Sequence, residues 1–305
     1  MKKPSITVAI SAYNEEENIE RFLESVVTQK EEGFRLKKIL VISDGSTDKT
    51  LSKVKSLKSP KLEVREYRER LGKSSRLNEI YDSLTSDILI QSDADVFFAH
   101  DYVIRDLIQP MLNDKKVGMS GGNPKPLKGK TFTEKAVNAT CEIYIDFRKS
   151  IRGGNNIFSA DGRLLAYRKN FIKKVLVPID MIANDAYTYY CCLTQGFGYR
   201  FVESAIVNFR SPQTLSDQIR QNTRFSASSI RMLRYFSEDL VNKESQVPLN
   251  ILVKSMLNQF IKHPILCSYI FLVNRYCQAK ANFSEKQMTA KWEIALTTKV
   301  LNQTS

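Results

Sequence analysis

The sequence predicts an α/β fold with a mostly parallel sheet flanked by helices, and three observations lead to this prediction. Short apolar segments at residues 5–12, 38–42 and 88–90 have the composition of buried strands. Segments with apolar residues at helical spacing separate them. Polar clusters follow the apolar segments, where strands would end. Strands that alternate with amphipathic helices form a parallel sheet that is covered on both faces.

The first predicted strand spans residues 5–12, where apolar residues alternate with smaller ones. We expect a helix to begin at Asn14, whose side chain can cap it while Glu17 closes a capping box. Residues 38–42 form the second predicted strand. Ser46 or Thr47 can cap the helix that follows it.

The pattern then repeats further along the chain. Residues 62–67 suggest a third strand, and Gly72 opens an amphipathic helix that extends to about residue 84. A buried strand at residues 88–90 ends at Asp93. In a sheet of this kind, connected by right-handed crossovers, ligands bind at the carboxyl ends of the strands.

The remaining chain divides into two further parts. Residues 117–205 are less regular and rich in glycine turns, and we expect loops and extra strands there. After about residue 213 the chain becomes helical and basic. We therefore expect one domain at residues 1–230, with halves at 1–115 and 116–230, followed by a helical basic region at 231–305.

Composition restricts the class of protein and its partners. The chain has 305 residues and a net charge of +13, which favours an anionic partner. Its five cysteines include no CxxC pair, so we expect reduced thiols. The first apolar stretch is too short for a signal peptide, and the run at residues 264–273 is half the length of a membrane span. We expect a cytoplasmic protein.

An amphipathic segment lies in the basic region. Residues 204–280 contain ten Lys or Arg and four Asp or Glu, which leaves a net charge of +6. Apolar residues recur at helical spacing between Leu249 and Ile261. This apolar face can pack on the catalytic domain, or residues 247–280 can contact the anionic inner face of a membrane as a peripheral anchor.

The polar clusters at the strand ends indicate the chemistry. They occupy residues 11–15, 44–46 and 93–95, and the sheet topology brings them to one edge. Asp93 and Asp95, spaced as D-x-D, can bind a hard divalent cation that holds diphosphate oxygens. Mg²⁺ or Mn²⁺ is the expected cofactor.

These clusters match a known pattern. The segments Ala9–Glu16, Ile42–Asp48 and Asp93–Asp95 resemble the family 2 glycosyltransferases of GT-A fold. Further matches, in the family's order over about residues 5–230, are Gly72-Lys73, Leu77-Asn78, Asp161-Gly162-Arg163, Ala166-Tyr167-Arg168, Asn184-Asp185, Gly198-Tyr199-Arg200 and Gln221–Phe225.

The resemblance implies a role for each matching residue on the donor side. It places Asp44 on the nucleotide base, Lys73 near the base or diphosphate, and Asp95 as the principal metal ligand, with Asp93 as its companion. The residues expected to bind the nucleotide-sugar are Ala12, Tyr13, Glu15, Asp44, Lys73, Asp93, Ala94 and Asp95.

The same resemblance implies that residues 1–230 are the glycosyltransferase domain, with 1–115 as its nucleotide-binding half and 116–230 as its acceptor-side half. Asp185 matches the family's general base, although the preceding residue, usually acidic, is Asn184 here. Gln221, Arg224 and Phe225 resemble the Q-x-x-R-W signature of processive polysaccharide synthases, with Phe in place of Trp. The implied reaction is an inverting transfer in which one carboxylate takes the proton of the attacking hydroxyl.

Several functions fit these observations. The preferred one is transfer of a sugar from a UDP- or GDP-sugar to a cell-surface glycan or lipid-linked acceptor. An inactive family member that acts as a scaffold is a second possibility. A nucleotidyltransferase should show a glycine-rich phosphate loop after the first strand, where this chain has Ala12–Glu16. A basic nucleic-acid-binding protein should show aromatic platforms or a helix-turn-helix, so no nucleic acid partner is expected.

Overall fold

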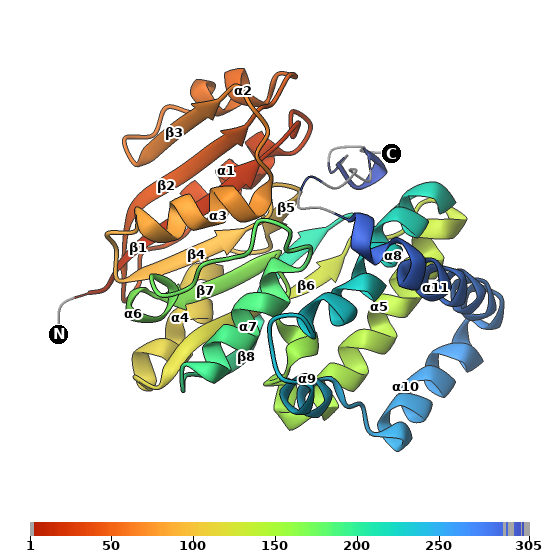
Figure 1. Cartoon of the computed structure of the whole chain (residues 1–305). Coiled ribbons are helices and arrows are strands. Elements are labelled where there is room, and N and C mark those ends of the chain that lie inside the picture. Colours follow the sequence, from red (N-terminus) through yellow and green to blue (C-terminus); the bar gives the residue numbers. More distant parts are fainter. Residues whose placement is uncertain (1–2, 289–290, 292–295, 300, 302–305) are drawn as a thin grey trace.

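The fold is built on one eight-stranded sheet (Figure 1). It is seen in a computed structural model that describes residues 3–288, 291, 296–299 and 301. The strands are β1 (Ser5–Ala12), β2 (Arg35–Asp44), β3 (Leu62–Tyr67), β4 (Ile88–Ser92), β5 (Val96–Phe98), β6 (Val117–Pro126), β7 (Leu164–Arg168) and β8 (Gly198–Phe209).

The strand order is β3-β2-β1-β4-β7-β6-β8-β5. Pairing is parallel from β3 to β4 and between β6 and β8, so four of the seven pairs in the described chain are parallel. The short strand β7 runs antiparallel to both β4 and β6, and β5 runs antiparallel to β8. The predicted α/β fold is confirmed, and the predicted strands at 5–12, 38–42, 62–67 and 88–90 are β1 to β4.

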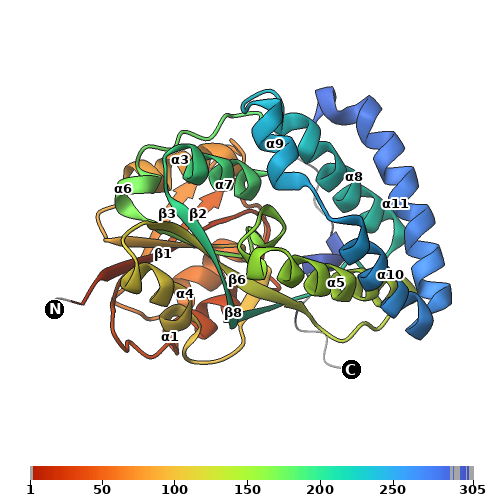
Figure 2. The same ribbon diagram turned by 90° about the horizontal axis from the view of Figure 1, so that it is seen from below.

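Helices cover both faces of the sheet. In Figure 2, α3, α6 and α7 lie on one side and α1 and α4 on the other. The alternation in β1 explains this, because Val8 faces the core beneath α1 and α4, while Ala9 faces the core beneath α3 and α7. The helices are α1 (Ile19–Val27), α2 (Thr50–Ser56), α3 (Lys73–Asp82), α4 (Val103–Asn113), α5 (Phe132–Ser150), α6 (Lys169–Ile172), α7 (Asn184–Thr194), α8 (Leu215–Met232), α9 (Glu238–Ser245), α10 (Leu249–Lys262) and α11 (Pro264–Ser284).

The predicted start of the first helix is wrong. Helix α1 begins at Ile19, and Asn14 has a φ of 52°, which lies in the left-handed region. The Asn14 side chain accepts a hydrogen bond of 2.9 Å from the backbone N–H of Thr47. Asn14 therefore links the turn after β1 to the turn after β2 instead of capping a helix.

The C-terminal helices extend beyond the sheet and pack on two earlier helices. Helix α11 contacts α8 and α5, and α10 contacts α5. Four short 3₁₀ turns complete the described structure: η1 (Arg152–Gly154), η2 (Ile157–Ser159), η3 (Glu285–Gln287) and η4 (Leu296–Lys299). In the part of the chain that the structure describes, no helix has the length and apolar character needed to cross a membrane.

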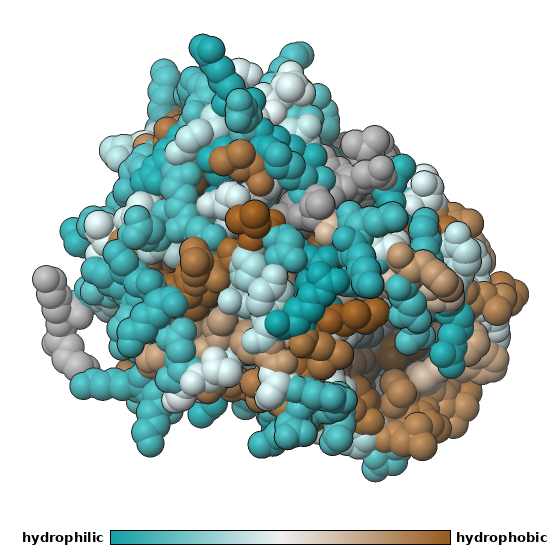
Figure 3. All heavy atoms as spheres, in the orientation of Figure 1, coloured by the Kyte–Doolittle hydropathy of each residue, from teal (hydrophilic) through white to brown (hydrophobic). Residues whose placement is uncertain are grey.

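Helix α10 does not pack on the rest of the protein through its apolar face, which was one of the two expectations for this segment. Its polar residues Ser255 and Gln259 are buried, whereas Leu257 and Ile261 are exposed, Ile261 by 72%. Figure 3 shows the resulting hydrophobic surface at the lower right, over α10 and α11. We define the apolar surface by its exposed members Leu249, Val253, Met256, Leu257, Phe260, Ile261, Ile265, Phe271 and Leu272.

Candidate active site

A pocket lies at the carboxyl ends of β1, β2 and β4, where the sheet topology predicts a ligand site. It has a volume of about 500 Å³. Strand ends supply its floor, and α8, α11 and the C-terminal segment supply its other walls. Among the predicted residues, those that line it are Tyr13, Glu15, Asp44, Lys73, Asp93, Ala94, Asp95, Gln221 and Arg224.

The two carboxylates of the D-x-D segment follow β4 directly. Asp93 accepts a hydrogen bond from the ammonium group of Lys73, which begins α3. Burial raises the pKa of Asp95, and the negative charge of Asp93 raises it further. Arg163, Lys299 and Lys73 act in the opposite direction. Asp95 is therefore a partly buried carboxylate whose ionised form is stabilised by positive charge nearby.

These carboxylates suit a divalent cation that is shared with a substrate. Across residues 3–288, 291, 296–299 and 301, no cluster of three or more His, Cys, Asp or Glu side chains has a geometry that could hold a metal. Mg²⁺ in proteins is commonly held by one or two carboxylates together with substrate phosphates and water. Asp93 and Asp95 fit that arrangement, in which a diphosphate supplies the missing oxygens.

Asp44 lies at the end of β2 and is only 2% exposed. Its carboxylate accepts hydrogen bonds from the backbone N–H groups of Leu71, at 2.9 Å, and Gly72, at 2.8 Å. It also accepts from Nε of Arg76 at 2.7 Å. Asp44 thus fixes the loop before α3 against the sheet edge. Its contact with a nucleotide base stays a prediction.

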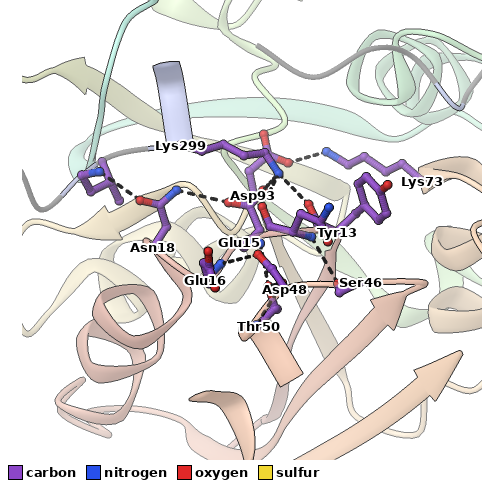
Figure 4. A network of polar contacts seen from close by, with 12 residues as sticks. Tyr13, Glu15, Glu16, Asn18, Ser46, Asp48, Thr50, Lys73, Asp93 and Lys299 are labelled. Carbon is purple, nitrogen blue, oxygen red and sulfur yellow. Dashed lines mark hydrogen bonds and ion pairs between the residues drawn. The ribbon is translucent and has the colours of Figure 1, made fainter. Parts of the chain in front are cut away.

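The turn after β1 also lines the pocket, through Tyr13 and Glu15. The guanidinium of Arg70 lies 4.1 Å from the ring centroid of Tyr13. Glu15 is buried, and its side chain forms an ion pair of 2.5 Å with Lys299 from the C-terminal segment (Figure 4). Ala12, also predicted to touch the nucleotide, is buried in the core and does not line the pocket.

The predicted general base begins α7. Asp185 accepts hydrogen bonds from the backbone N–H groups of Gly162, at 3.1 Å, and Ala186, at 2.8 Å. Burial raises the pKa of Asp185, with a further contribution from the charge of Asp161. Lys73 lies close enough to oppose this rise. Asp185 therefore adjoins the pocket wall without being one of its lining residues.

Asn184, the residue before Asp185, is buried. Asn184 Oδ1 accepts a hydrogen bond of 3.0 Å from the hydroxyl of Ser74, which lies in α3. Its Nδ2 atom is buried and has no hydrogen-bond partner among the residues that the structure describes. This arrangement links α7 to α3 at the back of the pocket.

Helix α8 carries the Q-x-x-R-F segment. Gln221 and Arg224 face the pocket, and burial lowers the pKa of Arg224 while the charges of Asp93 and Asp185 raise it. Phe225 is half-exposed and does not line the pocket. The structure therefore brings Arg224 to the carboxylates but leaves Phe225 on another side of the helix.

Two residues with no predicted role join the site. Arg163 lies within the Asp161-Gly162-Arg163 motif, and its charge acts on both Asp93 and Asp95. Lys299 lies in a segment that carries no recognisable motif. Only its positive charge could have suggested it, and the chain has 46 Lys or Arg residues.

Comparison with protein families matches residues 7–176, more than half of the chain, to "Glycosyl transferase family 2". The poly-beta-1,6-N-acetyl-D-glucosamine synthase of Staphylococcus aureus is 28% identical over 277 residues, which cover 88% of this chain and 63% of the relative. A probable glycosyltransferase of Bacillus subtilis, YdaM, is 27% identical over 235 residues, covering 73% of this chain and 54% of the relative. The chain thus spans less than two thirds of the length of these relatives.

Solved structures share the fold. A mannosyltransferase from Pyrobaculum calidifontis in complex with GDP-Man and Mn²⁺ superposes with a TM-score of 0.59 at 19% identity, covering 97% of this chain and 78% of that chain. Glucosyl-3-phosphoglycerate synthase from Mycobacterium tuberculosis, in complex with Mn²⁺, UDP and phosphoglyceric acid, gives 0.52 at 15% identity, covering 75% and 78%. The family match and the shared architecture show that this chain belongs to glycosyltransferase family 2 and has the GT-A fold.

Proposed function

We propose that this glycosyltransferase moves a sugar from a nucleotide-diphosphate donor to an acceptor hydroxyl with inversion, using a divalent cation and Asp185 as the general base. The observation that carries the proposal is the pocket in which the carboxylates of Asp93 and Asp95 face Lys73 and Arg224. A cavity lined by both cations and carboxylates suits a ligand made of diphosphate and metal.

The donor pocket favours a diphosphate by its charge. Carboxylates from four residues line it, namely Glu15, Asp44, Asp93 and Asp95. Seven cationic residues line it as well: Arg70, Lys73, Arg220, Arg224, Lys280, Lys291 and Lys299. The lining therefore carries excess positive charge, which attracts the phosphates of a UDP- or GDP-sugar.

Asp93 and Asp95 would hold Mg²⁺ or Mn²⁺ together with the diphosphate oxygens. The cation, when bound, neutralises charge on the diphosphate leaving group. Arg224 and Lys73 add positive charge on the same side. The complexes of two structural neighbours with Mn²⁺ support this cofactor class.

Asp185 would accept the proton during transfer. The acceptor oxygen forms a bond to the anomeric carbon as the bond from that carbon to the diphosphate oxygen breaks, and the hydroxyl proton moves to the Asp185 carboxylate. The hydrogen bonds from Gly162 and Ala186 orient the carboxylate. The raised pKa of Asp185 makes it a stronger base than an exposed aspartate.

A growing glycan or a lipid-linked glycan is the acceptor that we propose. The relative from Staphylococcus aureus is named as a synthase of poly-beta-1,6-N-acetyl-D-glucosamine, which is a glycan polymer. This chain spans 63% of that relative, and the size of the product distinguishes extension of a polymer from single transfers.

An anionic membrane surface is the environment that we propose for the transfer. The apolar surface of α10 and α11 faces outward while buried polar residues face the protein. Residues 249–284 contain no Asp or Glu and four Lys or Arg. An apolar helix face with only basic charges around it suits anionic lipid headgroups. Helix α11 also carries Lys280 and Ser284 into the pocket lining, so one helix joins the apolar surface to the active site.

Vesicle binding tests the membrane contact. We expect the protein to sediment with phosphatidylglycerol-containing vesicles, and the Leu257→Glu/Ile261→Glu variant to lose most of that binding. The matched control is Leu176→Glu, because Leu176 is as exposed as Ile261, at 73%, and lies in the loop between α6 and α7. Equal binding by both variants and the parent protein would reject this contact.

Donor binding and turnover test the transfer itself. Calorimetry with UDP and GDP, with and without Mn²⁺, should show metal-dependent binding of one nucleotide, and the corresponding NDP-sugar should be consumed when an acceptor glycan is added. The anomeric configuration of the product, read by NMR, distinguishes inversion from retention. Absence of nucleotide binding at any metal concentration would overturn the proposal.

A further inference from the structure

The C-terminal segment enters the donor pocket and is anchored on both sides of it. On one side, the Thr297 hydroxyl donates to Asp217 at 2.6 Å, and the Gln213 side chain donates to the Thr297 carbonyl at 2.9 Å. On the other side, the backbone N–H of Leu301 donates to Asn18 Oδ1 at 3.0 Å. Lys299 lies between these anchors and lines the pocket.

The ammonium group of Lys299 is fully engaged by the turn after β1. It donates to the carbonyl oxygens of Tyr13, at 2.6 Å, and Asn14, at 2.9 Å, and pairs with the Glu15 carboxylate at 2.5 Å. Three acceptors use all three donors of an ammonium group. Figure 4 shows the Lys299 side chain reaching this turn beside Asp93 and Lys73.

Lys299 also acts on the carboxylate that we assign to the metal. Its charge lowers the pKa of Asp95, and the charges of Glu15 and Asp95 act on each other, so the three groups lie within Coulombic range. A divalent cation at Asp95 would thus bind close to a fixed positive charge. Two positive charges that lie several ångströms apart in a partly buried site repel each other strongly, because water screens them less there than at an exposed surface.

We propose that Lys299 makes binding of the divalent cation depend on the nucleotide diphosphate. This inference rests on the proposed function. Without a nucleotide, the ammonium of Lys299 satisfies Glu15 and opposes the metal at Asp95. A diphosphate adds negative charge that attracts both cations, so the metal and the nucleotide strengthen each other's binding. Such coupling is reciprocal by thermodynamic linkage.

This coupling between cation and diphosphate disfavours the state in which the site holds a metal but no donor nucleotide. A metal held by two carboxylates and water would keep open positions that other anions could take. With Lys299 in place, the metal is retained mainly when the diphosphate accompanies it. The segment that carries Lys299 is far from the D-x-D residues in sequence but is anchored at Thr297 and Leu301, so the charge is delivered to a fixed position.

Mn²⁺ binding to the full chain tests this inference without any measurement of turnover. Free Mn²⁺ is measured by electron paramagnetic resonance, with and without UDP or GDP, for the parent protein, Lys299→Met and Lys299→Arg. We expect Lys299→Met to bind Mn²⁺ alone about 5-fold more tightly or better, and to show a smaller gain on nucleotide addition, because typical couplings are about 5- to 150-fold. Lys299→Arg should retain the coupling of the parent protein.

The matched control is Lys53→Met. Lys53 donates to the Glu16 carbonyl at 2.7 Å and pairs with Glu20 at 2.9 Å, so it binds the same region of chain from outside the pocket. Its loss should leave both Mn²⁺ affinities unchanged. An unchanged or weaker affinity of Lys299→Met for Mn²⁺ alone would overturn the inference. Failure of the parent protein to bind Mn²⁺ with either nucleotide would instead overturn the proposed function.

Discussion

The ammonium group of Lys73 donates a hydrogen bond to Asp93, so the two carboxylates of the D-x-D segment have different surroundings. Asp93 is already paired with a cation that begins α3. Asp95 is partly buried, and its pKa is raised first by that burial and then by the charge of Asp93. Asp95 is thus the carboxylate whose charge a divalent cation would satisfy best.

We expect Asp95→Asn to abolish metal-dependent nucleotide binding, because the amide keeps the shape of the side chain but removes the negative charge. Isothermal titration calorimetry with Mn²⁺ and the cognate nucleotide measures this. Asp101→Asn serves as the control, since Asp101 is a half-exposed carboxylate that pairs only loosely with Lys30, at 3.7 Å. Unchanged affinity in Asp95→Asn would show that the metal assignment is wrong.

Asp185→Asn should separate binding from chemistry. Its amide oxygen can still accept one of the two hydrogen bonds that Gly162 and Ala186 donate to separate oxygens of the carboxylate. Asp185 does not line the donor pocket, so donor affinity should stay within a few-fold of the parent value. The kcat should fall by about 10²–10⁴-fold, the usual contribution of a positioned general base. Steady-state turnover and nucleotide titration on the same preparation give both values, and retained turnover would exclude Asp185 as the base.

The donor side of the site could be predicted because it depends on local patterns. Strand β4 is a short apolar run, and the residues that follow it must emerge at the carboxyl edge of the sheet. The same reasoning applies to Asp44 after β2. Topology then brings these residues together, although they are far apart in sequence.

Other parts of the site depend on tertiary packing that no local pattern encodes. Periodicity identified the apolar face of α10 but could not show that Ser255 and Gln259 would be the buried residues of this helix. Lys299 reaches Glu15 across 284 positions of sequence through a segment without a motif. The left-handed turn at Asn14 also escaped prediction, because an asparagine before acidic residues has the composition of a helix cap.

A buried arginine links α8 to the C-terminal turn and should contribute strongly to stability. Arg231 is 1% exposed and pairs with Glu285 and Asp180, and it also donates to the Glu285 carbonyl at 2.8 Å. Arg231→Leu leaves the buried Glu285 carboxylate with one less partner. Removing one member of a buried ion pair costs about 3–5 kcal/mol.

Arg234 provides the matched comparison. It pairs with the same Glu285 and Asp180, but its side chain is 41% exposed. Arg234→Leu should lower the free energy of unfolding by about 1 kcal/mol or less, as for other exposed pairs. Urea unfolding of both variants measures the difference. Equal losses would show that burial of Arg231 does not determine its contribution.

Glu15 should give the folding free energy a distinct pH dependence. Burial raises the pKa of Glu15 from 4.5 to about 7, although Lys299 opposes the rise. Between these two values the folded chain holds a proton on Glu15 that the unfolded chain has released. The stabilisation from this group is therefore complete below about pH 4.5 and is lost as the pH rises through about 7.

The comparison of the parent protein with Glu15→Gln isolates this contribution. Glutamine does not titrate, so the difference in free energy of unfolding between the two proteins should change by about 3 kcal/mol from pH 4.5 to pH 7.5, with the parent losing stability relative to the variant. Urea unfolding at pH 4.5, 6 and 7.5 gives the values. The hydrogen bonds lost in Glu15→Gln shift this difference by a constant amount. They therefore do not affect its change with pH, which is the quantity that the experiment measures. Parallel pH profiles would contradict the assignment of a raised pKa to Glu15.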